Sequence, residues 1–479
     1  MKISFLFPSW TEVFGKFSRL AQKTSGFPPL NMALLAAIAE KQGHQVQIID
    51  GEIEGLNNQE IIKRVKEFSP DLIGMTGTTP GFHLVARLAK ELKEQMDVPI
   101  TAGGHHVTLF KEKIFDNNFD FLFVSEADIS FADFLKAYAK KDDLTKVKGL
   151  LFKRNAEIIF TGNPGLTQDL DAIPFPARHL LKYEKYKVGT LHGTLNYTSI
   201  MTTRGCPFEC IYCSNSVYGR NVRRRSVENV ISEIETVVNQ FGIRHFYFVE
   251  DVLTLNKQFS LSLCDEIDKR GLKITFEGST RANLFDEELA KRMSKSGLIR
   301  LSFGLESADP KILKIIKKQV PLESYTQANK LTNKYGIETI NSVMLGLPGQ
   351  DRVSIEKTIT FLRKAKDIQH TTYGIAMPYP GTEFYEMAKK GEYGLKLHTE
   401  DFSKYQRYGS AVLSVGDLSP EDLIRLQKEG LLKIYMTSWR IWPMLKRVKL
   451  RSVVVPVWEA VCAIVYSLFR KKNKTMGKK

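Results

Sequence analysis

Short apolar runs alternate with amphipathic segments over the first 140 residues of the chain. The apolar runs predict five buried strands, and the segments between them predict four helices. The strands are expected at residues 3–7, 45–50, 72–76, 99–102 and 121–124, and the helices at 31–41, 59–68, 82–95 and 130–139. Strands that alternate with helices are typical of a parallel, doubly wound α/β sheet, which binds ligands at the carboxyl ends of its strands.

The same alternation resumes near residue 197 and predicts a second α/β unit. Its six strands are expected at residues 198–203, 245–250, 273–279, 300–303, 339–345 and 371–377, and they fit a partial (β/α)6 barrel of the TIM type. A proline-punctuated stretch at 169–178 reads as an extended connector. We therefore expect a doubly wound domain over 1–142, a linker over 143–192, a barrel over 193–395 and a helical C-terminal region over 396–479.

The net charge of +16 is concentrated at the C-terminus. Residues 440–479 contain eleven Lys or Arg and one acid, which gives +10 in this segment and leaves only +6 for the rest of the chain. A nucleic-acid partner is therefore not expected, because the domains themselves carry no concentrated basic surface.

The C-terminal segment has the composition of a membrane-surface anchor. It contains an apolar run at 452–469 with basic residues on both sides and tryptophans at 439, 442 and 458. The run is barely long enough to span a bilayer, so an interfacial position is predicted, and a helix pair packed on the protein's own surface is the alternative. With no secretory signal and no cysteine framework, we expect a cytoplasmic protein that is peripheral at the inner face of the membrane.

Three of the five cysteines lie within eight residues, as Cys206, Cys210 and Cys213. A structural zinc site normally needs four ligands, and a disulfide framework needs an even number of cysteines. Three thiolates on one short loop favour a [4Fe–4S] cluster with one iron left open. A zinc site completed by a distant histidine and three purely structural cysteines are the alternatives.

The C-x3-C-x2-C spacing, with the aromatic Tyr212 just before the last cysteine, resembles the radical S-adenosylmethionine (SAM) superfamily. The resemblance implies that SAM binds the open iron and that the reduced cluster cleaves SAM to a 5′-deoxyadenosyl radical. It also implies an electron donor of the flavodoxin or ferredoxin type.

Glycine- and threonine-rich loops follow the third and fourth predicted strands of the first unit, where paired glycines allow a backbone to approach a bulky ligand. With the motif downstream, this unit resembles the Rossmann-like cobalamin-binding domain of cobalamin-dependent radical SAM enzymes. The resemblance implies cofactor contacts from Thr76, Thr78, Gly103, Gly104, His105, His106, Thr108 and Glu126. The Asp-x-His-x-x-Gly signature is absent, so no histidine ligand from that motif is expected. The alternative is a sheet that binds no cofactor.

Polar residues also stand where the predicted barrel strands end, at Glu250, Asp251, Ser279, Arg281, Glu306 and Ser307. The resemblance implies that Glu250 and Asp251 support the SAM amino group and that Glu306 and Ser307 lie near its ribose. Arg281 is expected to pair with the SAM carboxylate. For any one of these residues, a structural cap or ion pair is an equal alternative.

Together these features predict a metal-binding, cobalamin-dependent radical SAM enzyme. The favoured activity is methylation of an unactivated carbon in a lipid-like substrate or another secondary metabolite, as in class B radical SAM methyltransferases. A cyclase or rearrangement enzyme without methyl transfer, similar to the anaerobic porphyrin cyclases, is the first alternative. A non-catalytic, membrane-associated metal-binding protein is the second.

Overall fold

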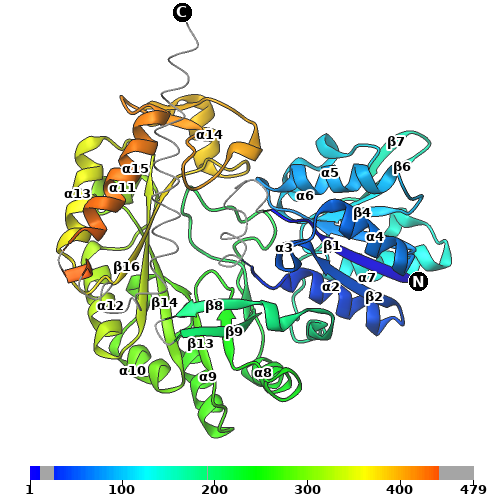
Figure 1. Ribbon diagram of the computed structural model, residues 1–479, viewed down its shortest axis with the longest axis horizontal. Helices are drawn as coiled ribbons and strands as arrows, with labels where there is room; N and C mark the ends of the chain where they lie inside the picture. The colour runs from blue at the N-terminus through cyan, green and yellow to red at the C-terminus, as the bar shows by residue number, and fades with distance from the viewer. Residues whose placement is uncertain (11–25, 191–192, 438, 442–479) are drawn as a thin grey trace, which may run out of the picture.

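The computed structural model describes residues 1–10, 26–190, 193–437 and 439–441, which form two α/β units side by side (Figure 1). The first unit is a seven-stranded sheet with the order β2-β1-β3-β4-β5-β6-β7. Its five parallel strands are β1 (Lys2–Phe7), β2 (Gln45–Asp50), β3 (Leu72–Thr76), β4 (Ile100–Gly103) and β5 (Phe121–Phe123). These confirm the five strands predicted from the apolar runs.

Helices cover both faces of this sheet. On one side α2 (Leu30–Lys41) packs against α7 (Asp128–Lys140), and on the other α4 (Asn58–Phe68) packs against α5 (Phe82–Lys93). Two short helices, α3 (Gly51–Glu54) and α6 (His105–Phe110), begin where β2 and β4 end. The stretch that forms α6 was expected to be a loop.

The second unit is an open, curved sheet with the order β16-β15-β14-β13-β12-β9-β8. Its strands are β8 (Lys187–Thr190), β9 (Gly193–Ile200), β12 (His245–Phe248), β13 (Thr275–Thr280), β14 (Leu298–Glu306), β15 (Glu338–Leu345) and β16 (His370–Ile375). The outer helices are α8 (Val227–Phe241), α9 (Lys257–Lys269), α10 (Glu287–Lys295), α11 (Pro310–Ile315), α12 (Leu322–Lys334) and α13 (Arg352–Lys364). The six parallel strands confirm the predicted partial barrel, and β8 is an added antiparallel edge.

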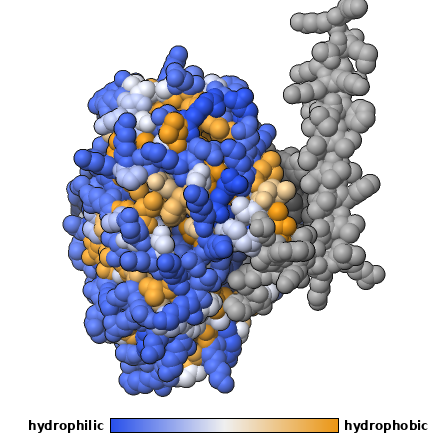
Figure 2. All heavy atoms as spheres, turned by 90° about the vertical axis from the view of Figure 1, so that its left-hand side faces the viewer, coloured by the Kyte–Doolittle hydropathy of each residue, from blue (hydrophilic) through white to orange (hydrophobic). Residues whose placement is uncertain are grey.

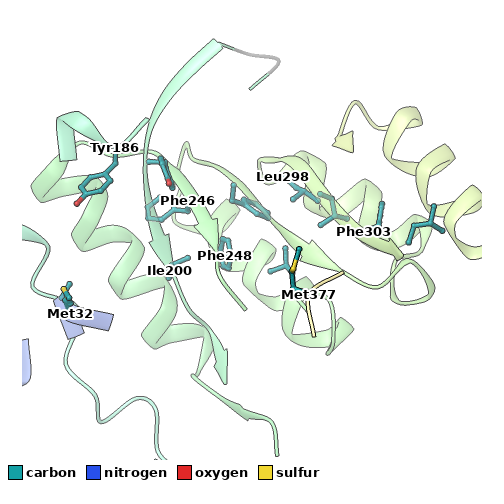
Figure 3. Packing of buried hydrophobic residues seen from close by; sticks show 14 of the residues in the cluster. Met32, Tyr186, Ile200, Phe246, Phe248, Leu298, Phe303 and Met377 are labelled. Carbon is teal, nitrogen blue, oxygen red and sulfur yellow. The ribbon is translucent and has the colours of Figure 1, made fainter. Parts of the chain in front are cut away.

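The segment expected to be a linker, 143–192, contributes strands to both units. β6 (Leu150–Arg154) and β7 (Glu157–Phe160) form a hairpin that extends the first sheet, and β8 joins the second. The extended connection is therefore confined to the chain between β7 and β8. A single hydrophobic core runs through both units, from Met32 on α2 to Phe246 and Phe303 in the barrel (Figure 3), so the units pack as one body.

After the barrel strands the chain forms α14 (Glu383–Lys390), the hairpin β17 (Leu395–Leu397) and β18 (Leu413–Val415), and α15 (Pro420–Tyr435). α15 lies in the C-terminal region that was expected to be helical, and it packs on α13 and β16. The outer face with α13 and α15 is mostly hydrophilic (Figure 2). Within the described ranges, no helix is both long and apolar enough to cross a membrane. The predicted anchor at 452–469 lies outside the described residues.

Candidate active site

The cysteine loop follows β10 (Thr203–Arg204), which pairs with β11 (Arg223–Arg224). Gly205 turns the chain into the loop with a φ of +93°, and a Cβ at this position would lie 2.3 Å from the Asn221 carbonyl oxygen. Ile211 fixes the middle of the loop, because its amide donates to Ile316 (3.3 Å) and its carbonyl accepts from Phe384 (3.0 Å). The loop is therefore held from both sides before any cofactor binds.

Neighbouring charges act on the ionisation of Cys206 and Cys213. Burial, with smaller contributions from the nearby Asp251, Cys206 and Cys210, raises the pKa of Cys213 to about 12. Burial also raises the pKa of Cys206. Without a bound cation these thiols stay protonated, so the site needs positive charge to hold thiolates, and iron supplies it.

Three thiols on one loop suit a cubane cluster. Among the residues that the structure describes, no three cysteine, histidine or carboxylate groups are placed to hold a single metal ion. In a [4Fe–4S] cluster each thiolate binds its own iron, so three thiols on one loop need only surround the cluster.

Behind the loop lies a buried triad that the sequence did not reveal as a unit. Glu306 Oε1 accepts hydrogen bonds from the Tyr212 hydroxyl (3.1 Å) and from Lys318 Nζ (3.1 Å), and Lys318 was not predicted. Glu306 has a φ of +62° at the end of β14, a strained conformation for a residue with a side chain. The triad connects the cysteine loop to the end of β14, because Tyr212 immediately precedes Cys213.

Arg281 lies against the same loop. Its guanidinium stacks on the Phe208 ring at 3.7 Å, its Nη1 is 3.7 Å from Cys210 Sγ, and its Nη2 donates to the Lys318 carbonyl. The Nε atom is buried and has no partner. The side chain therefore carries a fixed positive charge beside the thiols, and a role toward the SAM carboxylate stays a prediction.

The other predicted strand-end residues differ in burial and in hydrogen-bond partners. Glu250 is buried with its Oε2 unpartnered, accepts a hydrogen bond from Thr202 Oγ1 (2.8 Å), and has a pKa raised by burial to about 7. Ser279 is half-buried on the neighbouring strand, and its carbonyl accepts from Leu253 (2.8 Å). Ser307 is fully buried and accepts from the amide of Asp309 (3.1 Å), which is the N-cap residue of α11, so Ser307 fixes the turn that leads into this helix.

The two units meet beside the cysteines. His105, the first residue of α6, has its Nδ1 atom 3.3 Å from the Ser216 hydroxyl, three residues after Cys213. Burial lowers the His105 pKa, while the negative charge of Asp251 acts to raise it. The end of β4 in the first unit and the cluster loop in the second therefore adjoin directly.

A cavity of about 650 Å³ opens at the carboxyl ends of β1 and β3. Phe7, Thr76, Gly77 and Thr78 line one side, and residues 405–408 from the C-terminal region line the other. The strand order changes direction between β1 and β3, which is where open α/β sheets bind ligands. Thr76 also donates to the Gly103 carbonyl (3.1 Å), which ties the cavity to the end of β4.

Gly103 and Gly104 differ in whether the structure leaves room for a side chain, and this difference predicts different effects of an alanine at each position. Gly104 has a φ of +105°, and its Cβ would lie 2.8 Å from Thr76 Oγ1, whereas a Cβ on Gly103 would make only ordinary contacts near 3.5 Å. We expect Gly104→Ala to lower cobalamin retention severalfold by shifting the β3 and β4 loops, while Gly103→Ala retains most of it. The cobalamin-to-protein ratio after reconstitution and desalting measures the effect, and equal retention in the two variants would contradict this assignment.

His106 is part of an aromatic cluster rather than a free loop. Its ring lies 4.3 Å from that of Phe82 and 4.5 Å from that of Phe110, and its Nδ1 is buried without a partner. The sequence predicts a loop position for His106. The structure corrects this, because His106 lies on α6 and its ring packs against Phe82 and Phe110. Thr108, two residues later, donates to the Gly104 carbonyl (2.8 Å) and accepts from the Ser125 amide (2.9 Å), so it fixes the turn.

Burial lowers the pKa of His106 to about 4, from an ordinary value of 6.5. The unfolded chain therefore takes up this proton first as pH falls, and stability that is present above pH 6.5 is lost progressively down to about pH 4. We expect the free energy of unfolding of His106→Phe to fall less on acidification than that of wild type, by up to about 3 kcal/mol. Urea unfolding at pH 7 and pH 4.5 measures it, with His398→Phe, at an exposed position, as the control. An unchanged acid dependence would exclude a neutral, buried His106.

Glu126 was expected to contact the cofactor, and its carboxylate instead joins the two units. Arg223 binds both of its oxygens (2.5 and 2.8 Å), Arg204 lies 3.3 Å from Oε2, and the Thr167 amide donates to Oε2 (3.0 Å). Arg204 also pairs with Asp128. Because both oxygens are engaged and buried, the structure leaves Glu126 a structural role.

Two family models match the chain in these regions. The radical SAM superfamily model matches residues 200–362, and the B12 binding domain model matches residues 21–135. An uncharacterized methyltransferase of Pyrococcus horikoshii is 34% identical over 416 residues, which cover 85% of this chain and 88% of that protein. The anaerobic magnesium-protoporphyrin IX monomethyl ester cyclase of Cereibacter sphaeroides is 25% identical over 85% of this chain and 66% of its own length.

The fold has a solved counterpart. The radical SAM methyltransferase TsrM from Kitasatospora setae, with cobalamin and a [4Fe–4S] cluster bound, superposes with a TM-score of 0.69 over 91% of this chain and 88% of that one, at 16% identity. Its likeness confirms the order of a Rossmann-like unit followed by a half-barrel. With the cysteine loop, the cavity at the β1–β3 edge and a relative that matches over most of both lengths, the chain belongs to the cobalamin-dependent radical SAM enzymes and uses a [4Fe–4S] cluster, SAM and cobalamin.

Proposed function

We propose that this enzyme methylates an unactivated carbon, and that its substrate is lipid-like or another secondary metabolite. The contact between His105 and Ser216 carries the proposal, because it brings the end of β4 in the cobalamin-binding unit against the cluster loop. A substrate between the two units could then reach both cofactors without moving. The P. horikoshii relative, named as a methyltransferase, supports the same reaction class.

When bound, the cluster and SAM supply a hydrogen-abstracting radical, and cobalamin supplies a methyl group. Within that scheme Cys206, Cys210 and Cys213 hold the cluster. Arg281 places a positive charge beside it, and the triad of Tyr212, Glu306 and Lys318 keeps the loop in position. Thr76 and Thr78 line the side of the first unit that would face cobalamin, and Gly104 lies against Thr76.

Product analysis separates this function from its alternative. Holoenzyme is incubated anaerobically with a reductant, a total lipid extract and SAM that carries a CD3 group. Methylation predicts a product heavier by one CD3 group, with S-adenosylhomocysteine and 5′-deoxyadenosine formed in about equal amounts. A cyclase, which the C. sphaeroides relative makes the second candidate, predicts 5′-deoxyadenosine without S-adenosylhomocysteine. Formation of neither compound would leave only the non-catalytic alternative.

The C-terminal segment supports a membrane-associated substrate. Residues 440–479 carry eleven basic side chains. Arg440 is buried against the carbonyls of Ile434 and Ile368, and each of the other ten contributes about 1 kcal/mol where it lies near an anionic leaflet. We expect a truncation before Trp439 to abolish pelleting with anionic vesicles while it keeps the cluster and SAM cleavage. Sedimentation at low and high salt measures this, because the electrostatic part of the binding weakens with salt. Equal pelleting of the two proteins would remove the anchor, and loss of the cluster would indicate that the segment packs on the enzyme.

A further inference from the structure

The cavity at the β1–β3 edge has a second wall that comes from outside the cobalamin-binding unit. Residues 402–408 lie between β17 and β18, far along the chain from the strands that they face. The Phe402 ring packs on Phe110 of α6 at 5.3 Å and on Tyr405 at 5.2 Å. This aromatic contact holds the segment across the open side of the cavity, where Tyr405, Gln406, Arg407 and Tyr408 line it.

Among the residues that line this cavity, the arginine is Arg407, and neighbouring residues hold it in place. Its carbonyl accepts from Ile375 (3.0 Å) and from the side-chain amide of Gln427 (3.1 Å). Its side chain crosses β16 at Gly374, where a Cβ would lie 2.5 Å from the guanidinium Nε. A larger residue at 374 would displace the arginine, so β16 leaves room for this side chain.

The guanidinium has neutral partners. Its Nη2 donates to Thr372 Oγ1 at 3.3 Å, and Thr372 in turn bonds Ser342 on β15 (3.0 Å). No carboxylate in the described ranges lies within ion-pairing distance of Arg407. Arg407 is exposed at the cavity, and besides the Thr372 hydroxyl its guanidinium carbon lies 5.9 Å from the Tyr408 ring. It therefore keeps most of its hydrogen-bonding capacity for a ligand, and its planar fork matches the oxygens of a phosphate.

We propose that Arg407 binds the phosphodiester of the cobalamin nucleotide. The inference rests on the assignment of this cavity to cobalamin in the proposed function. The opposite wall is the β1–β3 edge of the unit that matches the B12 binding domain, so cobalamin is the ligand expected there. Its nucleotide phosphodiester carries a fixed negative charge that an arginine can bind through charge-assisted hydrogen bonds. The C-terminal region is thus part of the cofactor site.

Cobinamide lacks the nucleotide and its phosphate, so it isolates this contact. Cluster-loaded wild type, Arg407→Gln, Arg407→Lys and Lys404→Gln are titrated anaerobically with cobalamin and with cobinamide, and binding is followed by visible absorbance. We expect Arg407→Gln to bind cobalamin roughly ten- to hundredfold more weakly and cobinamide unchanged. Arg407→Lys should recover part of the loss. Lys404→Gln removes an equal charge from the same segment outside the cavity and should match wild type.

The remaining outcomes decide against the proposal in different ways. Unchanged cobalamin binding in Arg407→Gln, or an equal loss for cobalamin and cobinamide, would overturn the phosphate contact while leaving the enzyme's cofactor intact. If Lys404→Gln lost the same cobalamin affinity, the effect would come from the positive charge of the segment in general and not from a contact made by Arg407. Wild type that binds neither corrinoid would overturn the cavity assignment itself. The cluster absorbance of each variant shows whether it is folded.

Discussion

Replacing any one of Cys206, Cys210 or Cys213 by alanine is expected to abolish the iron–sulfur absorbance and all SAM cleavage. Two thiolates hold a [4Fe–4S] cluster poorly, and the loop offers no spare thiol to replace the lost ligand. The charge of Asp251 raises the pKa of Cys206 and of Cys213, so these thiols depend on bound iron to stay ionised. The measurement is iron and sulfide content with 5′-deoxyadenosine formation after anaerobic reconstitution.

Cys264→Ala is the matched control. This cysteine is buried on α9, and burial raises its pKa to about 11, so it is an inert core thiol. Its removal should cost some stability but leave cluster content unchanged. A full cluster in any of the three loop variants would contradict the assignment. One zinc per chain in place of iron would instead restore the zinc alternative.

The sequence predicts the sheets well because they are set by local patterns. The segments 72–76 and 339–345 form β3 and β15 within a residue. The first reads as a nearly continuous apolar stretch, as buried parallel strands do, and the second is rich in apolar and β-branched residues despite Asn341 and Ser342. α6 was missed because Gly103 and Gly104 resemble a loop, while the left-handed φ of Gly104 turns the chain directly into a helix. The hairpin of β6 and β7 was missed because it adds to the sheet edge through pairing with β5, which no local pattern encodes.

The candidate site divides in the same way. The cysteines are visible because a short spacing encodes them, and Tyr212 follows from its place beside Cys213. Lys318 and Arg407 reach their sites from loops distant in sequence, and nothing in their surroundings marks them. Glu126 was assigned to the cofactor through a family resemblance at the end of a strand, but its partners Arg204 and Arg223 lie in another unit. A position at the end of a strand therefore predicts where a side chain is attached, but only the three-dimensional structure shows which residues it contacts.

Arg223→Met is expected to destabilise the protein by roughly 3–5 kcal/mol, because it leaves the Glu126 carboxylate buried without its main partner. Arg223 is almost fully buried, binds both Glu126 oxygens and also donates to the carbonyls of Thr167 (2.9 Å) and Tyr218 (2.9 Å). The network contains two arginines, Glu126 and Asp128, so its formal charges balance in the wild type and the loss of any one of the four unbalances them. Thermal and urea unfolding measure the loss.

Adding Glu126→Gln to Arg223→Met restores charge balance, and the double variant should therefore recover part of the stability despite removing a second native group. Arg220→Met removes an exposed arginine three residues away, which lies 3.9 Å from Glu209, and should change stability by less than about 1 kcal/mol. If the double variant were less stable than Arg223→Met by the full cost of Glu126→Gln alone, the two side chains would be energetically independent. The ion pair would then not be what joins the cobalamin-binding unit to the cluster loop, and the shared hydrophobic core through α2 and the barrel would carry that coupling alone.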